Sequence, residues 1–288
     1  YGSKGLSTHH IKRFDSTMVS TFSRLLSGMQ VGNTSKGKTQ VKFTTEFKDD
    51  FLIHMAFHQD QAHLSEETAL KEAVLDRTDK SKAEISVFDK GLKSRQSFTD
   101  FDAQQTLFVG RAHENPRYVF LKTHTPNDTR PVEERDELEF IQDSAVNLYE
   151  SNQKICPTEF RLVQYRIKKS GLLISFVTNV WDLDAAVIAQ IYKMRWDIEV
   201  LFRFMKQEMN LTHFVCNDIN AIEVMLYCTL ITSMLVLIYK KKNEIKSYKR
   251  AKTYFFKELL YEIVLEMLEV PETTEYLKQI IQKFVRKQ

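Results

Sequence analysis

Alternating apolar and polar side chains predict strands near the start of the chain. Residues 10–14 alternate weakly and form a candidate short strand that ends at Asp15. Residues 39–47 and 51–57 are stronger β-like runs, separated by the polar residues 48–50. Two such runs joined by a short polar turn are typical of a β-hairpin.

A helix and a further strand follow this hairpin. Ser65 is a typical helix N-cap, and two glutamates follow it in the first turn of a helix that continues to about residue 76. Residues 84–88 then form a short apolar strand that ends at Asp89. The predicted order is strand, strand, strand, helix, strand, with Asp15 and Asp89 both at strand ends.

The pattern changes to closely spaced strands after residue 104. The β-like segments are residues 107–110, 118–123, 145–149, 160–167 and 172–178. Because they interrupt an otherwise mixed α/β pattern, we interpret residues 105–170 as a β-rich insertion. The core then comprises residues 1–104 and 171–240, and residues 241–288 form a helical C-terminal region.

Helical periodicity dominates from residue 182 onwards. Residues 183–209 are predicted to form one long amphipathic helix and residues 218–239 a second. The tail gives two more helices, with Pro271 at a helix start. The apolar run 225–239 is shorter than the roughly 20 residues that a membrane span needs, so it is interpreted as a buried core helix.

Composition adds three constraints to this picture. The 288 residues carry a net charge of only +3, yet basic side chains cluster in residues 36–48, 161–169 and 240–250. Such clusters are typical either of nucleic-acid binding or of a solvated surface. Three cysteines, an odd count, favour a reducing cytoplasm. Because the sequence begins at Tyr1, we expect a fragment that lacks an amino-terminal part.

The long predicted helix carries a polar stripe beside its apolar face. At about 100° per residue, the stripe falls within about 60°; its members are Tyr192, Arg195, Glu199 and Lys206. Trp196 lies about 40° from Tyr192 and could stack on a base or pack against the protein. The stripe alone is also explained by a surface ion pair of Glu199 with Arg195 or Arg203.

Two strand-end aspartates change the interpretation of this stripe. Asp15, Asp89 and Glu199 together supply the carboxylate oxygens that Mg²⁺ prefers, with coordination positions left for phosphate oxygens. Arg195 and Lys206 could then hold flanking phosphates.

These residues and their spacing resemble those of a known family. Tyr192, Arg195, Glu199 and Lys206 have the spacing of the YREK signature of DDE transposases of insertion sequence family 4. Residues 15–17 resemble that family's first aspartate motif, and residues 87–91 its second. Residues 211–214 and 220–222 are similar to the segment after the glutamate. The resemblance extends from about residue 11 to residue 240.

The resemblance implies a fold and a reaction. The fold is α/β, with a ribonuclease H-like core (a mixed sheet flanked by helices), a β-rich insertion and a helical C-terminal tail. The reaction is cleavage of DNA at transposon ends, followed by transfer of the 3′-hydroxyl end to target DNA. Asp15, Asp89 and Glu199 would be catalytic and would bind two Mg²⁺ ions, which Mn²⁺ could replace. Tyr192, Arg195, Lys206 and Trp196 would contact DNA.

The resemblance also implies partners and a location. We expect double-stranded DNA as partner, a dimer on DNA, no membrane, and a prokaryotic cytoplasm in association with the nucleoid. Two departures stand out: Leu92 replaces a common aromatic residue, and the domain that grips transposon ends would precede Tyr1. Two alternatives therefore remain, a general metal-dependent nuclease of the same fold and an inactive truncated remnant that only binds DNA.

Overall fold

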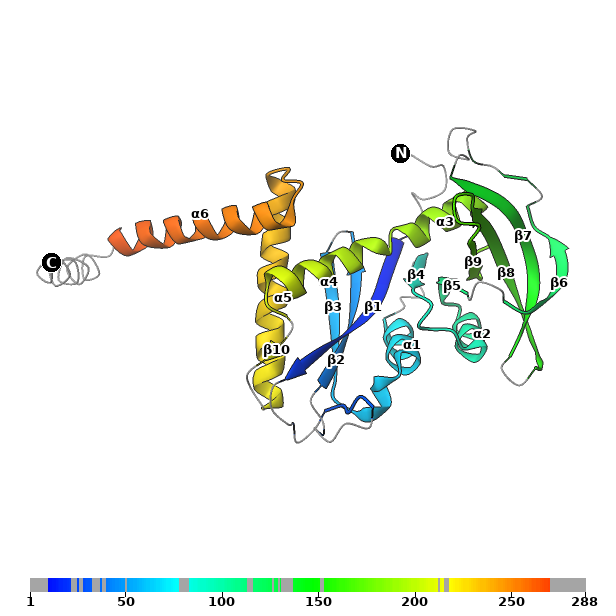
Figure 1. Ribbon diagram of the computed structural model, residues 1–288, viewed down its shortest axis with the longest axis horizontal. Helices are drawn as coiled ribbons and strands as arrows, with labels where there is room; N and C mark the ends of the chain where they lie inside the picture. Colours follow the sequence, from blue (N-terminus) through cyan, green and yellow to red (C-terminus); the bar gives the residue numbers. More distant parts are fainter. Residues whose placement is uncertain are drawn as a thin grey trace, which may run out of the picture. The chain divides into compact units, whose positions relative to one another are not determined.

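The computed structural model describes most of the chain (Figure 1). The described residues are 10–21, 25, 28–32, 37, 40–49, 51–77, 83–112, 116–125, 127–128, 130, 137–150, 153–211, 213–214 and 218–269. The chain divides into two compact units, residues 1–226 and residues 227–288.

The first unit is built on a mixed sheet. Its amino-terminal strands are β1 (His10–Thr21), β2 (Gln40–Lys48), β3 (Phe51–His58), β4 (Glu84–Phe88) and β5 (Leu107–Arg111). They lie in the order β3-β2-β1-β4-β5. Strand β2 is antiparallel to β1 and β3, whereas β4 is parallel to both β1 and β5. The predicted hairpin is confirmed as β2 and β3.

Helices cover both faces of this sheet. They are α1 (Glu66–Asp76), α2 (Arg95–Ala103) and α3 (Ala185–Lys193). Phe88 of β4 packs in a cluster with Leu70 of α1 and Phe98 of α2. Its neighbour Val87 packs in a different cluster with Ile188 of α3. Because successive side chains of a strand point to opposite faces, α1 and α2 cover one face and α3 covers the other.

The sheet continues without a break into the predicted insertion. The further strands are β6 (Tyr118–Thr123), β7 (Leu138–Tyr149), β8 (Ile155–Ile167) and β9 (Leu173–Thr178). They extend the order as β5-β9-β8-β7-β6 through antiparallel pairs. Strand β5 follows the proposed boundary at residue 104 yet pairs with β4 of the core. The division into core and insertion at residues 104 and 170 stays a prediction.

A buried ion pair ties β7 and β8 to the start of α3. The Arg161 guanidinium donates to both oxygens of Asp143 at 2.8 Å, and both side chains are 0% exposed. It also donates to the carbonyls of Val180 (2.9 Å) and Leu183 (2.6 Å) in the connection to α3. The polar groups of this cluster are thus satisfied by one another.

The single long helix predicted over residues 183–209 is wrong. The structure has two helices, α3 and α4 (Trp196–Glu208), with a turn at Met194 and Arg195. Backbone hydrogen bonds in this turn span three residues, for example from the Arg195 amide to the Tyr192 carbonyl at 3.0 Å. Bonds of this kind wind the chain more tightly than an α-helix, so the regular 100° step does not hold across the turn.

Strand β1 is longer than predicted. It passes through Asp15 and ends at Thr21, because its pairing with β2 continues to Ser20. At that end it also gains a parallel partner in β10 (His213–Phe214). The prediction that Asp15 ends a strand is therefore wrong: Asp15 lies within β1.

The second unit contains most of α5 (Ile219–Lys242) and all of α6 (Tyr248–Glu269). The interpretation of α5 as a buried core helix is wrong, since Ile231 is 59% exposed and Ile238 is 49% exposed. By length and composition α5 is apolar enough to cross a membrane, which is a weak indication by itself. Of the two helices predicted for the tail, the one starting at Pro271 lies outside the described residues.

Candidate active site

The register between β1 and β4 brings two aspartates together. The parallel pairing of these strands ends at Arg13 opposite Val87. Asp15 lies two residues after Arg13 and is still paired with β2, and Asp89 lies two residues after Val87 and directly follows β4. Asp15 and Asp89 therefore lie near each other at the point where β4 ends and β1 continues, and the negative charge of Asp89 acts on Asp15.

The turn after β4 fixes the Asp89 carboxylate. The Gly91 amide donates to the Asp89 Oδ1 at 2.8 Å. A side chain at position 91 would not fit, because a Cβ there would lie 2.8 Å from the same Asp89 oxygen. The glycine thus allows the backbone to close tightly around this carboxylate.

The turn between α3 and α4 places Arg195 beside two acidic side chains. Its guanidinium forms an ion pair with Glu199, one turn further along α4, and its Nη1 lies 3.9 Å from the Asp15 Oδ2. The Arg195 Nε has no hydrogen-bond partner among the described residues. Arg195 therefore links Glu199 to Asp15 while its hydrogen-bonding capacity is only partly used.

Strand β1 anchors this turn as well as carrying Asp15. The buried Arg13 guanidinium donates to the Asp197 carboxylate at 3.0 Å and to the Met194 carbonyl at 3.4 Å. Because Arg13 and Asp15 are two residues apart on one strand, their side chains point to the same face. The same short segment of β1 thus positions one carboxylate of the site and the start of the helix that carries another.

The other predicted DNA-contacting residues fall into two groups. Tyr192 packs against Phe176, and the Arg195 guanidinium lies 5.5 Å from the centre of its ring. Burial lowers the pKa of Lys206, while the negative charge of Asp15 acts in the opposite direction. Tyr192, Arg195 and Lys206 are therefore near the acidic side chains. Trp196 is 53% exposed and is stacked by Arg203 at 5.8 Å.

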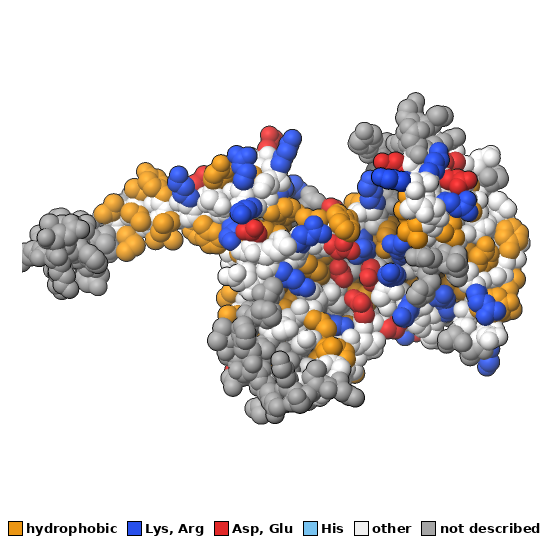
Figure 2. Space-filling view, in the orientation of Figure 1, with side chains coloured by type: hydrophobic (Ala, Val, Ile, Leu, Met, Phe, Trp, Pro, Cys, Tyr) orange, Lys and Arg blue, Asp and Glu red, His pale blue; other side chains and the backbone are white. Residues whose placement is uncertain are grey.

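Burial is the main influence on the pKa of Asp15, and the nearby positive charge offsets it only in part. Burial raises the pKa of Asp15 to about 7, and the negative charges of Asp89 and Glu66 act in the same direction. Arg195 and the Ser16 amide, which donates to the Asp15 Oδ1 at 2.8 Å, oppose this increase only in part. Figure 2 shows acidic side chains gathered over α1 and α4, with basic side chains beside them.

These donors fit hard divalent cations. Carboxylate oxygens are the ligands that Mg²⁺ takes, and the raised pKa of Asp15 marks a place where a cation would be stabilising. Among the described residues, no three His, Cys, Asp or Glu side chains converge with metal-site geometry. Glu199 is instead bound by Arg195, so it would have to exchange the guanidinium for a metal ion.

Sequence reasoning missed three charged residues near this site. The negative charge of Glu66, on α1, adds to the effect of burial on the pKa of Asp15. Burial lowers the pKa of Lys42, with Glu66 opposing, and the Lys42 Nζ donates to the Leu64 carbonyl at 2.8 Å. Burial raises the pKa of Tyr192, and Arg111, at the end of β5, is among the cations that oppose this shift. None of the three had a local sequence signal, since each comes near the site only through the packing of β2, α1 and β5.

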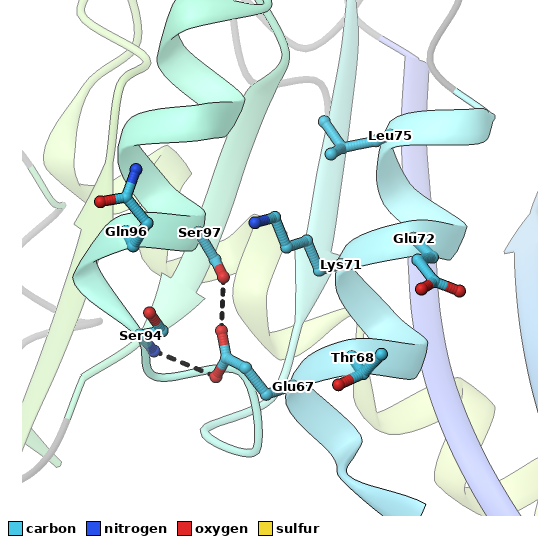
Figure 3. Close-up of a pocket in the computed structure, with 8 residues that line it drawn as sticks. All are labelled: Glu67, Thr68, Lys71, Glu72, Leu75, Ser94, Gln96 and Ser97. Atoms are coloured by element: carbon cyan, nitrogen blue, oxygen red, sulfur yellow. Dashed lines mark hydrogen bonds between the residues drawn. The ribbon is translucent and has the colours of Figure 1, made fainter. Parts of the chain in front are cut away.

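A cavity of about 460 Å³ lies between α1 and α2, apart from these residues (Figure 3). It is lined by Glu67, Thr68, Lys71, Glu72, Leu75, Ser94, Gln96 and Ser97. None of the predicted site residues lines it. The acidic group on β1, β4 and α4 is therefore the better candidate for chemistry.

A mixed sheet with one aspartate within β1, a second directly after the adjacent strand β4, and a glutamate on α4 defines an α/β protein with a candidate acidic site. The model of the transposase DDE domain family matches residues 10–235. The chain belongs to this family. The predicted resemblance to DDE transposases is therefore confirmed, and its narrower assignment to insertion sequence family 4 is compatible with the match.

Two curated relatives carry transposase names. One, named as transposase y4zB of Sinorhizobium fredii, is 30% identical over 159 residues, which are 55% of this chain and 43% of the relative. The other, named as a transposase for insertion sequence element IS5377 of Geobacillus stearothermophilus, is 27% identical over 152 residues, or 47% and 39% of the two chains. The matched region is less than half of each relative's own length.

Among solved structures, the chain is similar to the piggyBac transposase in a synaptic complex with hairpin DNA, determined by cryo-EM. The TM-score is 0.54 at 14% sequence identity, and the match covers 96% of this chain and 57% of that chain. At this identity the similarity concerns the fold. It confirms the ribonuclease H-like core with a mixed sheet flanked by helices.

Proposed function

We propose that this chain is the catalytic region of a cut-and-paste DNA transposase. It would hydrolyse a phosphodiester at each transposon end and then join the freed 3′-hydroxyl to target DNA. The observation that carries the proposal is the strand register that brings Asp15 and Asp89 to one point, beside the Arg195 and Glu199 pair. Membership of the transposase DDE domain family supports the same reaction class.

In this proposal Asp15, Asp89 and Glu199 hold two Mg²⁺ ions, with Mn²⁺ as a substitute. Two such ions supply Lewis-acid stabilisation of the attacking and leaving oxygens of an in-line displacement at phosphorus. Arg195 would have to release Glu199 for that carboxylate to hold a cation, and its planar fork would then be available to bind a DNA phosphate. Lys206 adds a point charge, and Tyr192 positions the guanidinium. Trp196, exposed at the start of α4, offers a stacking surface for a base.

The partners follow from the reaction. Double-stranded DNA at the transposon ends and at the target is the substrate, and joining two ends requires two catalytic centres, so we infer a dimer on DNA. The place of action would be the prokaryotic cytoplasm, at the nucleoid, with no membrane involved. The piggyBac structure is itself a complex with hairpin DNA, which supports DNA as the ligand class.

The experiment that tests the proposal measures cleavage and strand transfer on duplexes that carry the terminal inverted repeats flanking the gene. Asp89→Asn and Glu199→Gln should each lower the cleavage rate at least about a thousandfold, equivalent to about 4 kcal/mol of transition-state stabilisation. Asp76→Asn, an exposed aspartate at the end of α1, is the matched control and should cleave like the parent.

The outcomes separate the alternatives. Loss of both steps in the two site variants supports the transposase. Cleavage by the parent without strand transfer points to a general nuclease. DNA binding without cleavage in either metal points to an inactive remnant. Unchanged cleavage by Asp89→Asn and Glu199→Gln contradicts the site assignment.

A further inference from the structure

Two adjacent glutamates at the start of α1 have different surroundings. Glu67 binds the start of α2: its Oε2 accepts from the amides of Lys93 (2.9 Å) and Ser94 (3.1 Å), and its Oε1 accepts from the Ser97 hydroxyl (2.5 Å). Figure 3 shows this carboxylate pointing at the first turn of α2. Free amides at a helix start favour a carboxylate there, so Glu67 has a complete structural role.

Glu66 points to the other side, over the turn that follows β4. A Cβ built on Gly91 would lie 2.5 Å from the Glu66 Oε2 and 2.8 Å from the Asp89 Oδ1. The two carboxylates therefore both lie close to Gly91, on the side where any other residue would carry a Cβ. Among the described residues the Glu66 carboxylate has no hydrogen bond or ion pair, in contrast to its neighbour Glu67.

The charges around Glu66 are those of the acidic site. Burial raises the pKa of Glu66, and the negative charge of Asp89 raises it further, while Lys42 and Arg195 oppose the shift. Neither cation forms an ion pair with it: the Lys42 Nζ donates to the Leu64 carbonyl, and Arg195 binds Glu199. Two carboxylates that face each other in this way repel when both are ionised, and a divalent cation between them would remove that repulsion.

We propose that Glu66 is a fourth carboxylate of the metal site and, together with Asp89, binds one of the divalent cations. This inference rests on the proposed function, because it concerns the same cations. Glu66 gives the site an oxygen ligand that is already directed at Asp89 while Glu199 is still bound by Arg195. A first cation would therefore bind to Asp89 and Glu66 before Arg195 releases Glu199.

Metal binding by the full chain without DNA tests this inference. Mn²⁺ is the probe, and its affinity is measured by the decrease of the free-ion electron paramagnetic resonance signal. Glu66→Gln should weaken the tightest Mn²⁺ site at least about tenfold, since even losing an outer-shell partner of a metal commonly costs that much. Its Tm in EDTA should not fall, because the substitution removes a carboxylate that lacks a partner.

Glu67→Gln is the matched control, at the next position of the same helix. It should lower the Tm in EDTA through the weakened contact with α2, yet leave the Mn²⁺ affinity of the folded protein unchanged. Asp89→Asn distinguishes failure of the inference on Glu66 from failure of the metal site in the proposed function. If Asp89→Asn loses Mn²⁺ affinity and Glu66→Gln does not, the inference on Glu66 is overturned alone. If neither variant loses affinity, the metal site of the proposed function fails with it.

Discussion

Two arginine–carboxylate contacts in the first unit show how a structural ion pair differs from one available for function. Arg161 and Asp143 are fully buried and joined by two hydrogen bonds of 2.8 Å, and two backbone carbonyls accept from the remaining guanidinium nitrogen. Arg195 is 11% exposed, pairs with Glu199, and stays 3.9 Å from the Asp15 carboxylate. At 3.9 Å this second contact is too long for a hydrogen bond.

This difference in hydrogen bonding determines whether each arginine can leave its carboxylate partner. A guanidinium whose three nitrogens all donate to buried acceptors cannot move without leaving those acceptors unpaired, so Arg161 holds β7, β8 and the start of α3 together. Arg195 has an unused Nε and an over-long contact with Asp15, so less is lost when it turns to another anion. The long contact with Asp15 therefore distinguishes Arg195, at the candidate active site, from Arg161 in the buried structural pair.

The largest expected effect on stability comes from breaking the buried pair of Arg161 and Asp143. Arg161→Ala leaves Asp143 buried and without its counter-charge, and should lower the free energy of unfolding by about 3–5 kcal/mol, measured by urea denaturation. The double variant Arg161→Met, Asp143→Leu should recover most of that loss, because it removes the buried charge altogether. A single variant as stable as the parent would contradict the role assigned to this pair.

Arg195→Ala should show the opposite balance. Its free energy of unfolding should change by less than about 1 kcal/mol, since the ion pair of Arg195 with Glu199 is partly open to solvent. Its cleavage rate should fall about a hundredfold, equivalent to about 2.7 kcal/mol, and Arg195→Lys should restore only part of it because an ammonium lacks the planar fork.

Arg203→Ala is the matched control for that measurement. Arg203 lies on the same helix α4 and is exposed, with its guanidinium over Trp196 instead of beside the acidic group. It should retain cleavage within a few-fold of the parent. Equal losses of cleavage in both variants would mean that the general positive charge of α4 matters and the position of Arg195 does not.

The pH dependence of the free energy of unfolding should report the raised pKa of Asp15. Its pKa of about 7 in the folded protein lies above the ordinary value of 3.8, so the folded state binds this proton more tightly than the unfolded state. The stabilising contribution is present at low pH and is lost as the pH rises towards 7. Between pH 5 and pH 7 in EDTA, the loss from this group should be about 2–3 kcal/mol.

Urea denaturation at several pH values measures this slope. Asp15→Asn cannot ionise, so its free energy of unfolding should fall less between pH 5 and pH 7 than that of the parent. Asp76→Asn removes the same charge from an exposed position and should keep the slope of the parent. Parallel curves for parent and Asp15→Asn would show that burial does not raise the pKa of Asp15.

Local patterns were sufficient for much of the fold. The hairpin of β2 and β3, helix α1 and strand β4 were all predicted, because each is specified by residues close together in the chain. The end of β1 was not, because pairing with β2 and with the distant β10 extends this strand past Asp15. The break before α4 also escaped prediction, since the polar stripe continues across the turn at Met194.

The candidate site could likewise be predicted only where its residues have a local sequence pattern. Asp15 and Asp89 stand out because each follows a segment predicted as a strand, and Glu199 because of its spacing from Arg195. Glu66 and Glu67 look identical in the sequence, as two acids in the first turn of a helix. Only the packing of α1 against the turn at Gly91 and against α2 gives them different partners. Such roles depend on contacts between distant segments and have no local signal.

The smallest expected effect comes from a third arginine–carboxylate contact, between β7 and β8 on the protein surface. The Arg166 Nη1 lies 3.1 Å from the Glu139 Oε2, and the two side chains are 46% and 48% exposed. Water screens such a pair and solvates each charge once the other is removed, so Arg166→Ala should change the free energy of unfolding by less than about 0.5 kcal/mol. Its distance is close to that of the Arg161 pair, so distance alone predicts similar effects. A loss from Arg166→Ala comparable to that from Arg161→Ala would show that burial does not distinguish these pairs, and would remove the basis for contrasting Arg161 with Arg195.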